Sequence, residues 1–165
     1  MCTYFHTTNK QIPVGETFSI EMFDGDTTTD HSNRSEPEKE INNLLDSARP
    51  EGTLSRKKCI YLFNNLAICK AYARSLGANH IYKVISHEDI FGPYPMTLLT
   101  TLKSCNDGNR QPIIEEYWNN TQNWKVNEFL TSSIVIMEEI SLGNGGYNIE
   151  PFTDDRVLSR KLYGC

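Results

Sequence analysis

Three observations predict an α+β fold for this chain of 165 residues. Apolar residues spaced by three or four, as on one face of a helix, occur mainly in the first two thirds of the chain. Short runs rich in β-branched and aromatic residues are scattered along the sequence and dominate its last third. The two kinds of segment do not alternate regularly, as they would around a parallel sheet. We therefore expect one α+β domain that spans residues 1–165.

The chain begins with two short predicted strands. Residues 2–8 include Thr, Tyr and Phe, which favour extended backbone, and residues 16–23 follow a break at Pro13 and Gly15. Residues 24–34 are polar and contain no apolar side chain that would anchor them. They predict a mobile loop, which is either an insertion or a lid.

A helix is predicted next, from residue 35 to residue 48. Ser35 and Glu38 match a capping box, and Pro37 stands in the first turn. The apolar stripe of this helix ends before Pro50, which cannot continue it.

The stretch from residue 59 to residue 77 predicts a buried strand that runs directly into a helix. Residues 59–63 are apolar and aromatic, Asn65 suits a helix N-cap, and Gly77 suits the helix end. This arrangement places Tyr61 on the strand and Tyr72 more than two turns into the helix. Two rings placed in this way can face each other across a gap wide enough for a flat ligand.

The remaining segments complete the α+β pattern. A turn at residues 106–109 separates two helical stretches. The predicted elements are strands at residues 80–86, 124–130 and 133–140, helices that begin at Pro95 and Pro112, and a short terminal helix within a C-terminal extension at residues 141–165.

The composition excludes several classes of function. The net charge of −5 provides no overall positive field for a nucleic-acid backbone. The five cysteines are widely spaced and include no C-x-x-C pair, which argues against a disulfide framework and a zinc site. The first residues lack a signal-peptide pattern, and no apolar run is long enough for a membrane helix. We therefore expect a cytoplasmic protein with reduced thiols, no membrane contact and no metal.

Two further residues accompany the tyrosine pair. His6 lies in the first predicted strand, and Glu128 lies in a late one. Alternation along that strand puts Glu128 on the same face as Val126 and Leu130. A carboxylate between apolar neighbours is costly unless it has a partner. Taken singly, each of these residues is more often structural, but their order along the chain favours a functional interpretation.

In this order the motifs resemble the ADP-ribosyltransferase fold, specifically its His-Tyr-Glu group, which includes diphtheria-type toxins and the poly(ADP-ribose) polymerases. The family pattern has His-Gly-Ser or His-Gly-Thr on the first strand, two tyrosines on a strand–helix unit, and Glu on a late strand. The matching segments are His6-Thr7-Thr8, Tyr61 with Tyr72, and Glu128-Phe129-Leu130. The resemblance covers the chain from its start to about residue 140. It implies a split, mostly antiparallel β-sheet flanked by helices.

The resemblance also implies an activity, that of an NAD-dependent mono-ADP-ribosyltransferase that releases nicotinamide and transfers ADP-ribose to a macromolecule. Glu128 would stabilise the cation that develops on the ribose, and Tyr61 would stack on the nicotinamide together with Tyr72. The residues that it implies are catalytic Glu128, His6 and Tyr61, and NAD-binding His6, Thr7, Thr8, Tyr61 and Tyr72. We add Arg56 to the NAD-binding residues because of its position just before the central strand.

Individual contacts can be assigned within this set. His6 would hydrogen-bond the ribose, and Thr8 would hydrogen-bond the carboxamide of the nicotinamide. Arg56 is either an ordinary loop residue or a contact to the pyrophosphate of a bound nucleotide, and we favour the pyrophosphate contact. Thr7 departs from the family's Gly, at a position whose backbone clasps the nicotinamide carboxamide.

The acceptor is predicted to be a nucleic-acid base or a protein side chain other than arginine. Arginine-modifying relatives carry Glu or Gln two residues before the catalytic Glu, and here that position is Val126. Asn123, Trp124 and Asn127 would dock the acceptor, with Trp124 either stacking on a base or packing in the core. By analogy with the family, we expect a bacterial or phage toxin, effector or defence protein, controlled by an antitoxin or another inhibitory partner.

Three alternatives remain open at this point. The first is a catalytically inactive binding module of the same fold. The second is an NAD glycohydrolase, and the third is an enzyme similar to the RNA 2′-phosphotransferases. The acidic composition disfavours the last of these. The adjacent acids Glu115 and Glu116 are interpreted as surface charge, since neighbouring side chains on a helix diverge.

Overall fold

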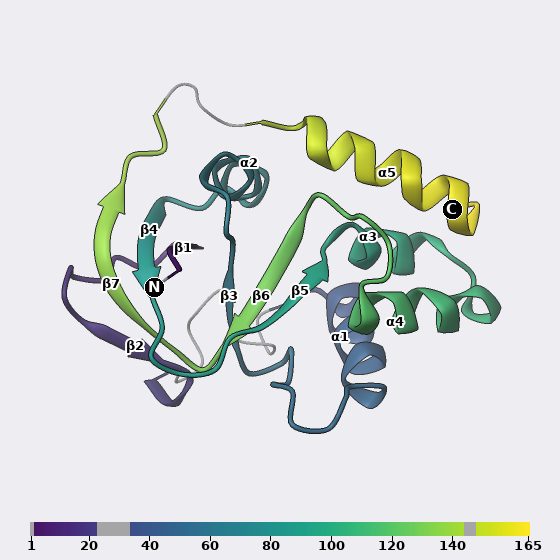
Figure 1. The fold of residues 1–165 in the computed structure, drawn as a ribbon, viewed down its shortest axis with the longest axis horizontal. Helices are drawn as coiled ribbons and strands as arrows, with labels where there is room; N and C mark the ends of the chain where they lie inside the picture. The colour runs from purple at the N-terminus through teal and green to yellow at the C-terminus, as the bar shows by residue number, and fades with distance from the viewer. Residues whose placement is uncertain (1, 23–33, 144–147) are drawn as a thin grey trace.

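Seven strands form two antiparallel sheets in the computed structural model, which describes residues 2–22, 34–143 and 148–165 (Figure 1). The four-stranded sheet has the order β1-β4-β7-β2, and the three-stranded sheet has the order β3-β6-β5. The strands are β1 Tyr4–Thr8, β2 Thr17–Ser19, β3 Ile60–Leu62, β4 His80–Ile85, β5 Phe91–Pro95, β6 Asn127–Thr131 and β7 Ser133–Ile140. The expected division of an antiparallel sheet is therefore confirmed.

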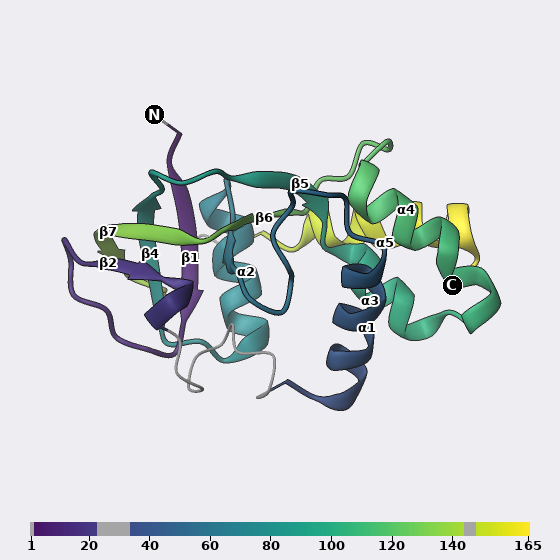
Figure 2. The same ribbon diagram turned by 90° about the horizontal axis from the view of Figure 1, so that it is seen from below.

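Helices cover the sheets mainly on one side. They are α1 Glu36–Ser47, α2 Leu66–Leu76, α3 Thr97–Ser104, α4 Arg110–Asn119 and α5 Glu150–Tyr163, with short 3-10 turns η1 Ile20–Met22 and η3 Asp107–Asn109. Figures 1 and 2 place α2 between the four-stranded sheet and the group formed by α1, α3, α4 and α5. The architecture is α+β, as the sequence predicts. The loop expected at residues 24–34 lies outside the described residues, apart from Arg34.

The two sheets meet at the centre of the molecule. Strand β6 continues into β7 after the single residue Ser132, so one stretch of chain belongs to both sheets. On the other side, Phe5 of β1 and Phe63 exchange two backbone hydrogen bonds of 2.8 and 2.9 Å. These two links bring β1 next to the end of β3, although more than 50 residues separate them.

Local signals in the sequence explain the ends of the helices. Asn65 accepts a hydrogen bond of 3.1 Å from the backbone N–H of Ile68, as an N-cap should. Gly77 ends α2 with φ of 65°, a conformation that suits glycine. At α1, the Glu38 carboxylate accepts from the backbone N–H of Ser35 at 3.1 Å. The capping box and the N-cap are thus confirmed.

Strand β5 was not expected from the sequence. Pro95, predicted to begin a helix, instead ends β5, and α3 begins two residues later. Gly92 and Pro93 lie within β5, and they argue against a strand prediction because glycine and proline are uncommon inside strands. Gly92 has φ of +126°, and a Cβ there would lie 2.9 Å from the carbonyl oxygen of Glu128. The close approach of β5 to β6 therefore requires glycine at this position.

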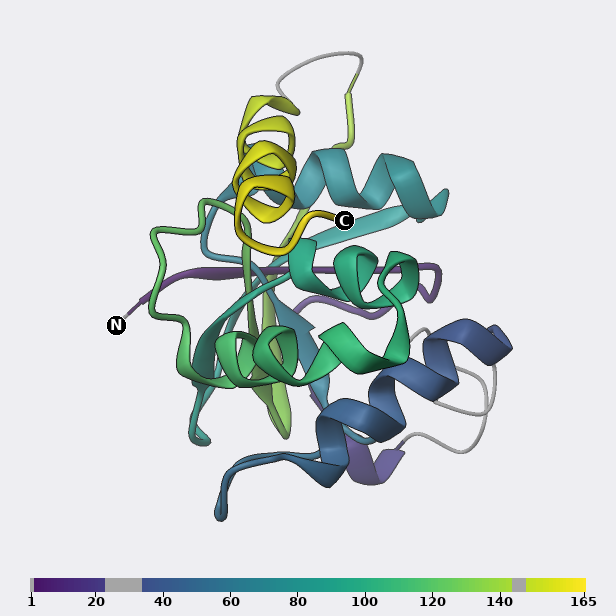
Figure 3. The same cartoon turned by 90° about the vertical axis from the view of Figure 1, so that its right-hand side faces the viewer.

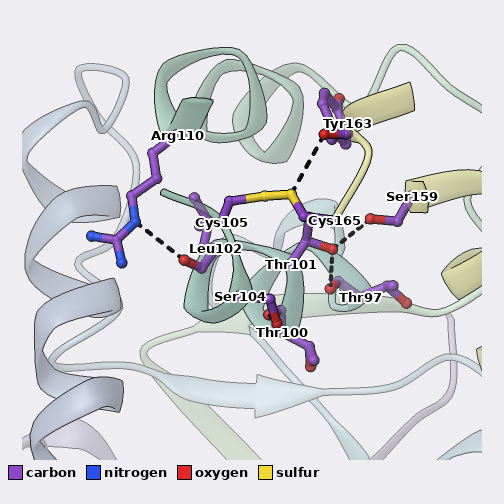
Figure 4. The surroundings of a disulfide bond; sticks show 10 residues. All are labelled: Thr97, Thr100, Thr101, Leu102, Ser104, Cys105, Arg110, Ser159, Tyr163 and Cys165. Carbon is purple, nitrogen blue, oxygen red and sulfur yellow. Dashed lines mark hydrogen bonds between the residues drawn. A yellow bond between two sulfur atoms is a disulfide. The ribbon is translucent and has the colours of Figure 1, made fainter. Parts of the chain in front are cut away.

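The C-terminal helix α5 is longer than the short helix expected and is attached to α3 at several points. Asp155 accepts hydrogen bonds from the backbone N–H groups of Lys125 and Val126 at 2.9 and 2.8 Å. The hydroxyls of Thr101 and Ser159 lie 2.5 Å apart (Figure 4). Figure 3 shows α5 along the α3 side of the molecule. The hydrogen bonds of Asp155 therefore attach the residues just before β6 to helix α5.

A disulfide between Cys105 and Cys165 completes this attachment (Figure 4). The expectation that every thiol is reduced is therefore wrong for these two residues. Their Cα atoms lie 5.7 Å apart, within the usual range for a disulfide, although 60 residues separate them in the chain. The spacing in the sequence could not reveal this pair, because it depends on the packing of α5 against α3.

Candidate functional site

Glu128 is buried at the middle of the three-stranded sheet, with only 2% of its surface exposed. It lies on β6, the central strand, opposite Tyr94 of β5. The sequence required a partner for a carboxylate in this position, and the structure provides two. Arg56 Nη1 donates to Glu128 Oε1, and the hydroxyl of Tyr117 donates to the same oxygen at 2.6 Å. The charge of Glu128 is therefore compensated inside the protein.

Arg56 is itself held by neighbours on every side. Its Nε–H donates to Oδ1 of Asn42 at 3.0 Å, and its Nη1 donates to Tyr117 as well as to Glu128. Its backbone N–H donates to Asp46 at 2.9 Å, which ties the loop before β3 to α1. Arg56 is thus a partner of Glu128, a relationship that the sequence analysis did not find.

Electrostatics keeps this cluster in a defined protonation state. Burial lowers the pKa of Arg56, but Glu128, Tyr117, Tyr61 and Cys59 together raise it more, so the pKa lies well above the usual value and the guanidinium stays charged. Burial raises the pKa of Tyr117 well above its usual value, and the Glu128 carboxylate adds to this effect. Tyr117 is therefore a neutral hydroxyl that donates to Glu128 at any ordinary pH.

Two adjoining cavities open beside this cluster. The first, which we call the glutamate cavity, has a volume of about 280 Å³. Its lining includes Glu128, Arg56, Asn42, Glu38, Arg34, Lys103, Met96, Tyr61 and Tyr72. The second, the histidine cavity, has a volume of about 190 Å³ and is lined by residues that include His6, Thr7, Phe63, Tyr61 and Tyr72. Because Tyr61 and Tyr72 line both, the two cavities lie next to each other.

His6 of β1 has a single tautomer that the structure identifies. The residue is 2% exposed, and burial lowers the pKa of its imidazole, so it is neutral near pH 7. Its Nδ1 lies 2.9 Å from the backbone carbonyl oxygen of Tyr61, which can only accept a hydrogen bond. The proton is therefore on Nδ1, and Nε2 is an acceptor. A ligand donor in the histidine cavity is the natural match for that nitrogen.

Thr7 fits the strand despite the departure from glycine. It lies in extended backbone in β1, and its hydroxyl donates to the carbonyl oxygen of His80 at 3.0 Å. Thr7 still lines the histidine cavity. Thr8, in contrast, is not among the lining residues of either cavity, and its hydroxyl accepts from the backbone N–H of Lys10 at 3.1 Å. The structure therefore brings Thr7 to the site and does not bring Thr8.

The two tyrosines form the shared wall of the cavities in different ways. Tyr61 donates its hydroxyl to the backbone carbonyl of Arg56 at 2.5 Å, and its ring lies under the guanidinium groups of Arg34 and Arg56, at 5.2 and 5.0 Å. Tyr72 packs its ring against Phe63, with centroids 5.1 Å apart. Both rings adjoin the space where a flat ligand was expected to bind, and Tyr61 already has cationic neighbours there.

Of the three residues expected to dock an acceptor, Trp124 is buried, Asn127 is partly buried and Asn123 is exposed. Val126 is fully buried, and the indole N–H of Trp124 donates to Glu116 at 2.8 Å. The core alternative for Trp124 is therefore the one that the structure shows. Glu116 is 7% exposed, so its interpretation as surface charge is wrong. It accepts from Trp124, from Thr121 and from the backbone of Gln122, which stabilises the turn after α4.

Two residues of the site were missed by the sequence analysis. Tyr117 lies among the buried residues of α4, and Asn42 on α1 lies next to the apolar stripe of its own helix. A polar residue beside such a stripe was the only available signal, and it is common in ordinary helices. Their roles depend on Arg56, which contacts both.

Within residues 2–22, 34–143 and 148–165, no group of three or more His, Cys, Asp or Glu side chains could hold a metal ion. No helix among the described residues is both long and apolar enough to span a bilayer. No protein-family model matches this chain, and no curated protein sequence shows significant similarity to it.

Proposed function

We propose that the protein is an NAD-dependent mono-ADP-ribosyltransferase that transfers ADP-ribose to a macromolecule and releases nicotinamide. The observation that carries the proposal is the position of Glu128. Its carboxylate is buried, charge-compensated by Arg56, and lines the glutamate cavity, whose Tyr61 and Tyr72 also line the adjoining histidine cavity. The order of these residues in the sequence supports the same proposal.

In this proposal Glu128 acts on the ribose. When the bond to nicotinamide breaks, positive charge develops on the ribose ring, as in glycoside cleavage. A carboxylate held in a fixed position beside that charge stabilises it without having to reorganise. Arg56 and Tyr117 supply the fixed position, because both bind the same oxygen of Glu128.

The other residues orient the substrate. His6 would accept a hydrogen bond through Nε2, and Tyr61 and Tyr72 would enclose the nicotinamide ring. Arg56, predicted to bind the pyrophosphate, is already engaged with three protein groups. Lys103 on the lining of the glutamate cavity is a cation in a better position to attract the phosphates.

The acceptor in this proposal is a nucleic-acid base or a protein side chain other than arginine. Val126, which replaces the residue that orients arginine in relatives of that kind, is buried and offers no hydrogen-bonding side chain. An enzyme that modifies macromolecules in its own cell needs control. We therefore include a toxin, effector or defence role and an inhibitory partner in the proposal.

The proposed location is the cytoplasm, and the disulfide makes this part testable. Disulfides persist mainly in oxidising compartments. Cells can be lysed in an alkylating reagent, and the state of Cys105 and Cys165 can be read by mass spectrometry. Alkylated thiols at both positions support the cytoplasm, and an intact disulfide assigns the protein to an oxidising compartment.

The activity is tested with NAD alone and then with acceptors. Release of free nicotinamide by the wild-type protein, and its loss in Glu128→Gln, is the expected result. NAD labelled in the adenylate, followed into protein, RNA, DNA and free ADP-ribose, then identifies the acceptor. Absence of nicotinamide release under all conditions would refute an enzyme, label in free ADP-ribose alone would indicate a hydrolase, and label chiefly on arginine would refute the acceptor class.

A further inference from the structure

Asn42 carries a buried hydrogen-bond donor that no other described residue accepts. The residue lies on α1, is 3% exposed and lines the glutamate cavity. Its Nδ2 has no hydrogen-bond partner among the described residues. Buried polar groups in folded proteins are nearly always paired, so an unpaired amide on a cavity wall calls for a reason.

The orientation of this amide follows from its neighbour. Oxygen and nitrogen of an asparagine side chain are assigned from the hydrogen bonds they make. Arg56 Nε–H can only donate, and it lies 3.0 Å from Asn42 Oδ1. The oxygen must therefore face Arg56, which leaves the two N–H groups of Nδ2 without an acceptor in the part of the chain that the structure describes. Exchanging the two atoms would set a donor against a donor.

Asn42 and Glu128 are neighbours because both bind the same guanidinium. Asn42 receives the hydrogen bond from Nε, and Glu128 receives one from Nη1. Both side chains line the same cavity. The two residues on this wall thus carry different groups, an amide donor with no described partner on Asn42 and a carboxylate acceptor on Glu128.

We infer that Asn42 and Glu128 together bind the two adjacent hydroxyls of a pentose. One hydroxyl donates to the Glu128 carboxylate, and its neighbour accepts from the Asn42 amide. A vicinal diol suits this wall because each hydroxyl both donates and accepts, and the two oxygens are separated by a single C–C bond. A deoxy sugar would leave the buried amide unpaired, which is the kind of penalty that produces strong discrimination.

The inference rests on the proposed function and makes it more specific. The hydroxyl next to the cleaved bond is the 2′-hydroxyl of the nicotinamide ribose, and the carboxylate that stabilises the developing charge must be nearest to it. Glu128 therefore takes the 2′-hydroxyl and Asn42 takes the 3′-hydroxyl. Asn42 becomes the residue that makes the site specific for an intact ribose.

The test compares NAD with its analogue that lacks the 3′-hydroxyl of the nicotinamide ribose. For the wild-type protein, kcat/KM for nicotinamide release should fall by about 10- to 100-fold with the analogue, which corresponds to one unpaired buried donor. In Asn42→Asp and Asn42→Leu, the two substrates should differ by less than about 3-fold, since the donor is absent for both. Asn43→Asp, a change at the exposed neighbour on the same helix, should retain the wild-type ratio.

The two Asn42 variants disturb the contact with Arg56 in different ways. An effect that both variants share can therefore be assigned to the loss of the amide donor. Aspartate keeps an acceptor for Arg56 Nε but adds a charge, whereas leucine adds no charge but removes that acceptor. They share only the loss of the amide donor. Thermal unfolding of each variant shows that it is folded before its kinetics are compared.

The outcomes separate the two proposals. A wild-type protein that releases no nicotinamide refutes the proposed function and this inference together. An active wild-type protein that treats the analogue like NAD, or Asn42 variants that keep the full discrimination, refutes the inference alone. Discrimination that disappears in both Asn42 variants and persists in Asn43→Asp supports it.

Discussion

Arg56 and Glu128, which lie 72 residues apart in the chain, form an ion pair in which each side chain is only 3% exposed. Arg56 precedes β3 and Glu128 is on β6, so the pair joins neighbouring strands of one sheet. Buried pairs of this kind contribute little net stability when intact, but loss of one partner leaves an uncompensated charge. The pair is therefore better understood as a device that fixes the carboxylate than as a source of stability.

Replacing Glu128 by glutamine should abolish most of the activity while keeping the fold. The amide oxygen can still accept from Arg56, so we expect only moderate destabilisation, but the negative charge that stabilises the ribose cation is lost. Nicotinamide release should fall by about 100- to 1,000-fold. Turnover close to that of the wild type, measured on a variant with an unchanged circular dichroism spectrum, would refute the role of Glu128.

The hydroxyl of Tyr117 should matter for turnover as well as for stability. Tyr117→Phe removes a hydrogen bond to Glu128 and an acceptor for Arg56, so we expect about 1–2 kcal/mol of lost stability and about a 10-fold lower kcat. Tyr82→Phe is the matched control, because the Tyr82 hydroxyl accepts from the backbone N–H of Ile12 and neither residue lines the two cavities of the site. Equal effects of the two changes on kcat would contradict a positioning role for Tyr117.

The buried imidazole of His6 should make stability depend on pH in a defined direction. Burial lowers its pKa in the folded protein, whereas the unfolded chain keeps the ordinary value of about 6.5. Below about pH 6.5 the unfolded state binds a proton that the folded state does not, so stability falls as the pH falls towards the folded pKa. Above pH 6.5 both states are neutral, and this contribution is fully present.

Urea unfolding between pH 5 and pH 8 measures this effect. The free energy of unfolding of the wild type should rise with pH more steeply than that of His6→Asn, which cannot titrate. Parallel curves for the two proteins would show that His6 is not held neutral. His87→Asn, at an exposed position, is the control for a general effect of removing a histidine.

Reduction of the Cys105–Cys165 disulfide should destabilise the protein. The bond closes a long stretch of chain, and the chain-entropy model gives about 4 kcal/mol for a loop of 60 residues. We expect dithiothreitol to lower Tm by on the order of 10 °C. The variant Cys105→Ser should have the lower Tm already and should not respond to dithiothreitol. An equal response of both proteins would assign the effect to something other than this bond.

Local features of the fold were predictable from the sequence, and pairings over long distances were not. The N-cap at Asn65 and the helix end at Gly77 each depend on a few neighbouring residues, so a short pattern was enough. The requirement that Glu128 have a partner also followed from its apolar neighbours. The identity of that partner did not, because Arg56 meets Glu128 only after β3 has paired with β6.

The same distinction explains the errors. Strand β5 was missed because Gly92 and Pro93 argue against a strand, while the close approach of β5 to β6 is what requires glycine there. Glu116 was interpreted as surface charge because its three donors come from the turn after its helix, which the helical pattern does not describe. The functions of His6, Tyr61 and Tyr72 stay predictions, although the structure brings these side chains to one site.

The disulfide between Cys105 and Cys165 encloses some residues of the candidate site in a covalent ring and leaves others outside it. Tyr117 and Glu128 lie within the segment of chain that the bond closes into a ring, whereas His6, Asn42 and Arg56 lie before it. A protease that cuts one peptide bond inside the ring cannot release a fragment, because the two pieces remain joined through sulfur. A cut between Arg56 and Cys105 separates the arginine from its glutamate covalently, and only the packing of the sheet then keeps them together.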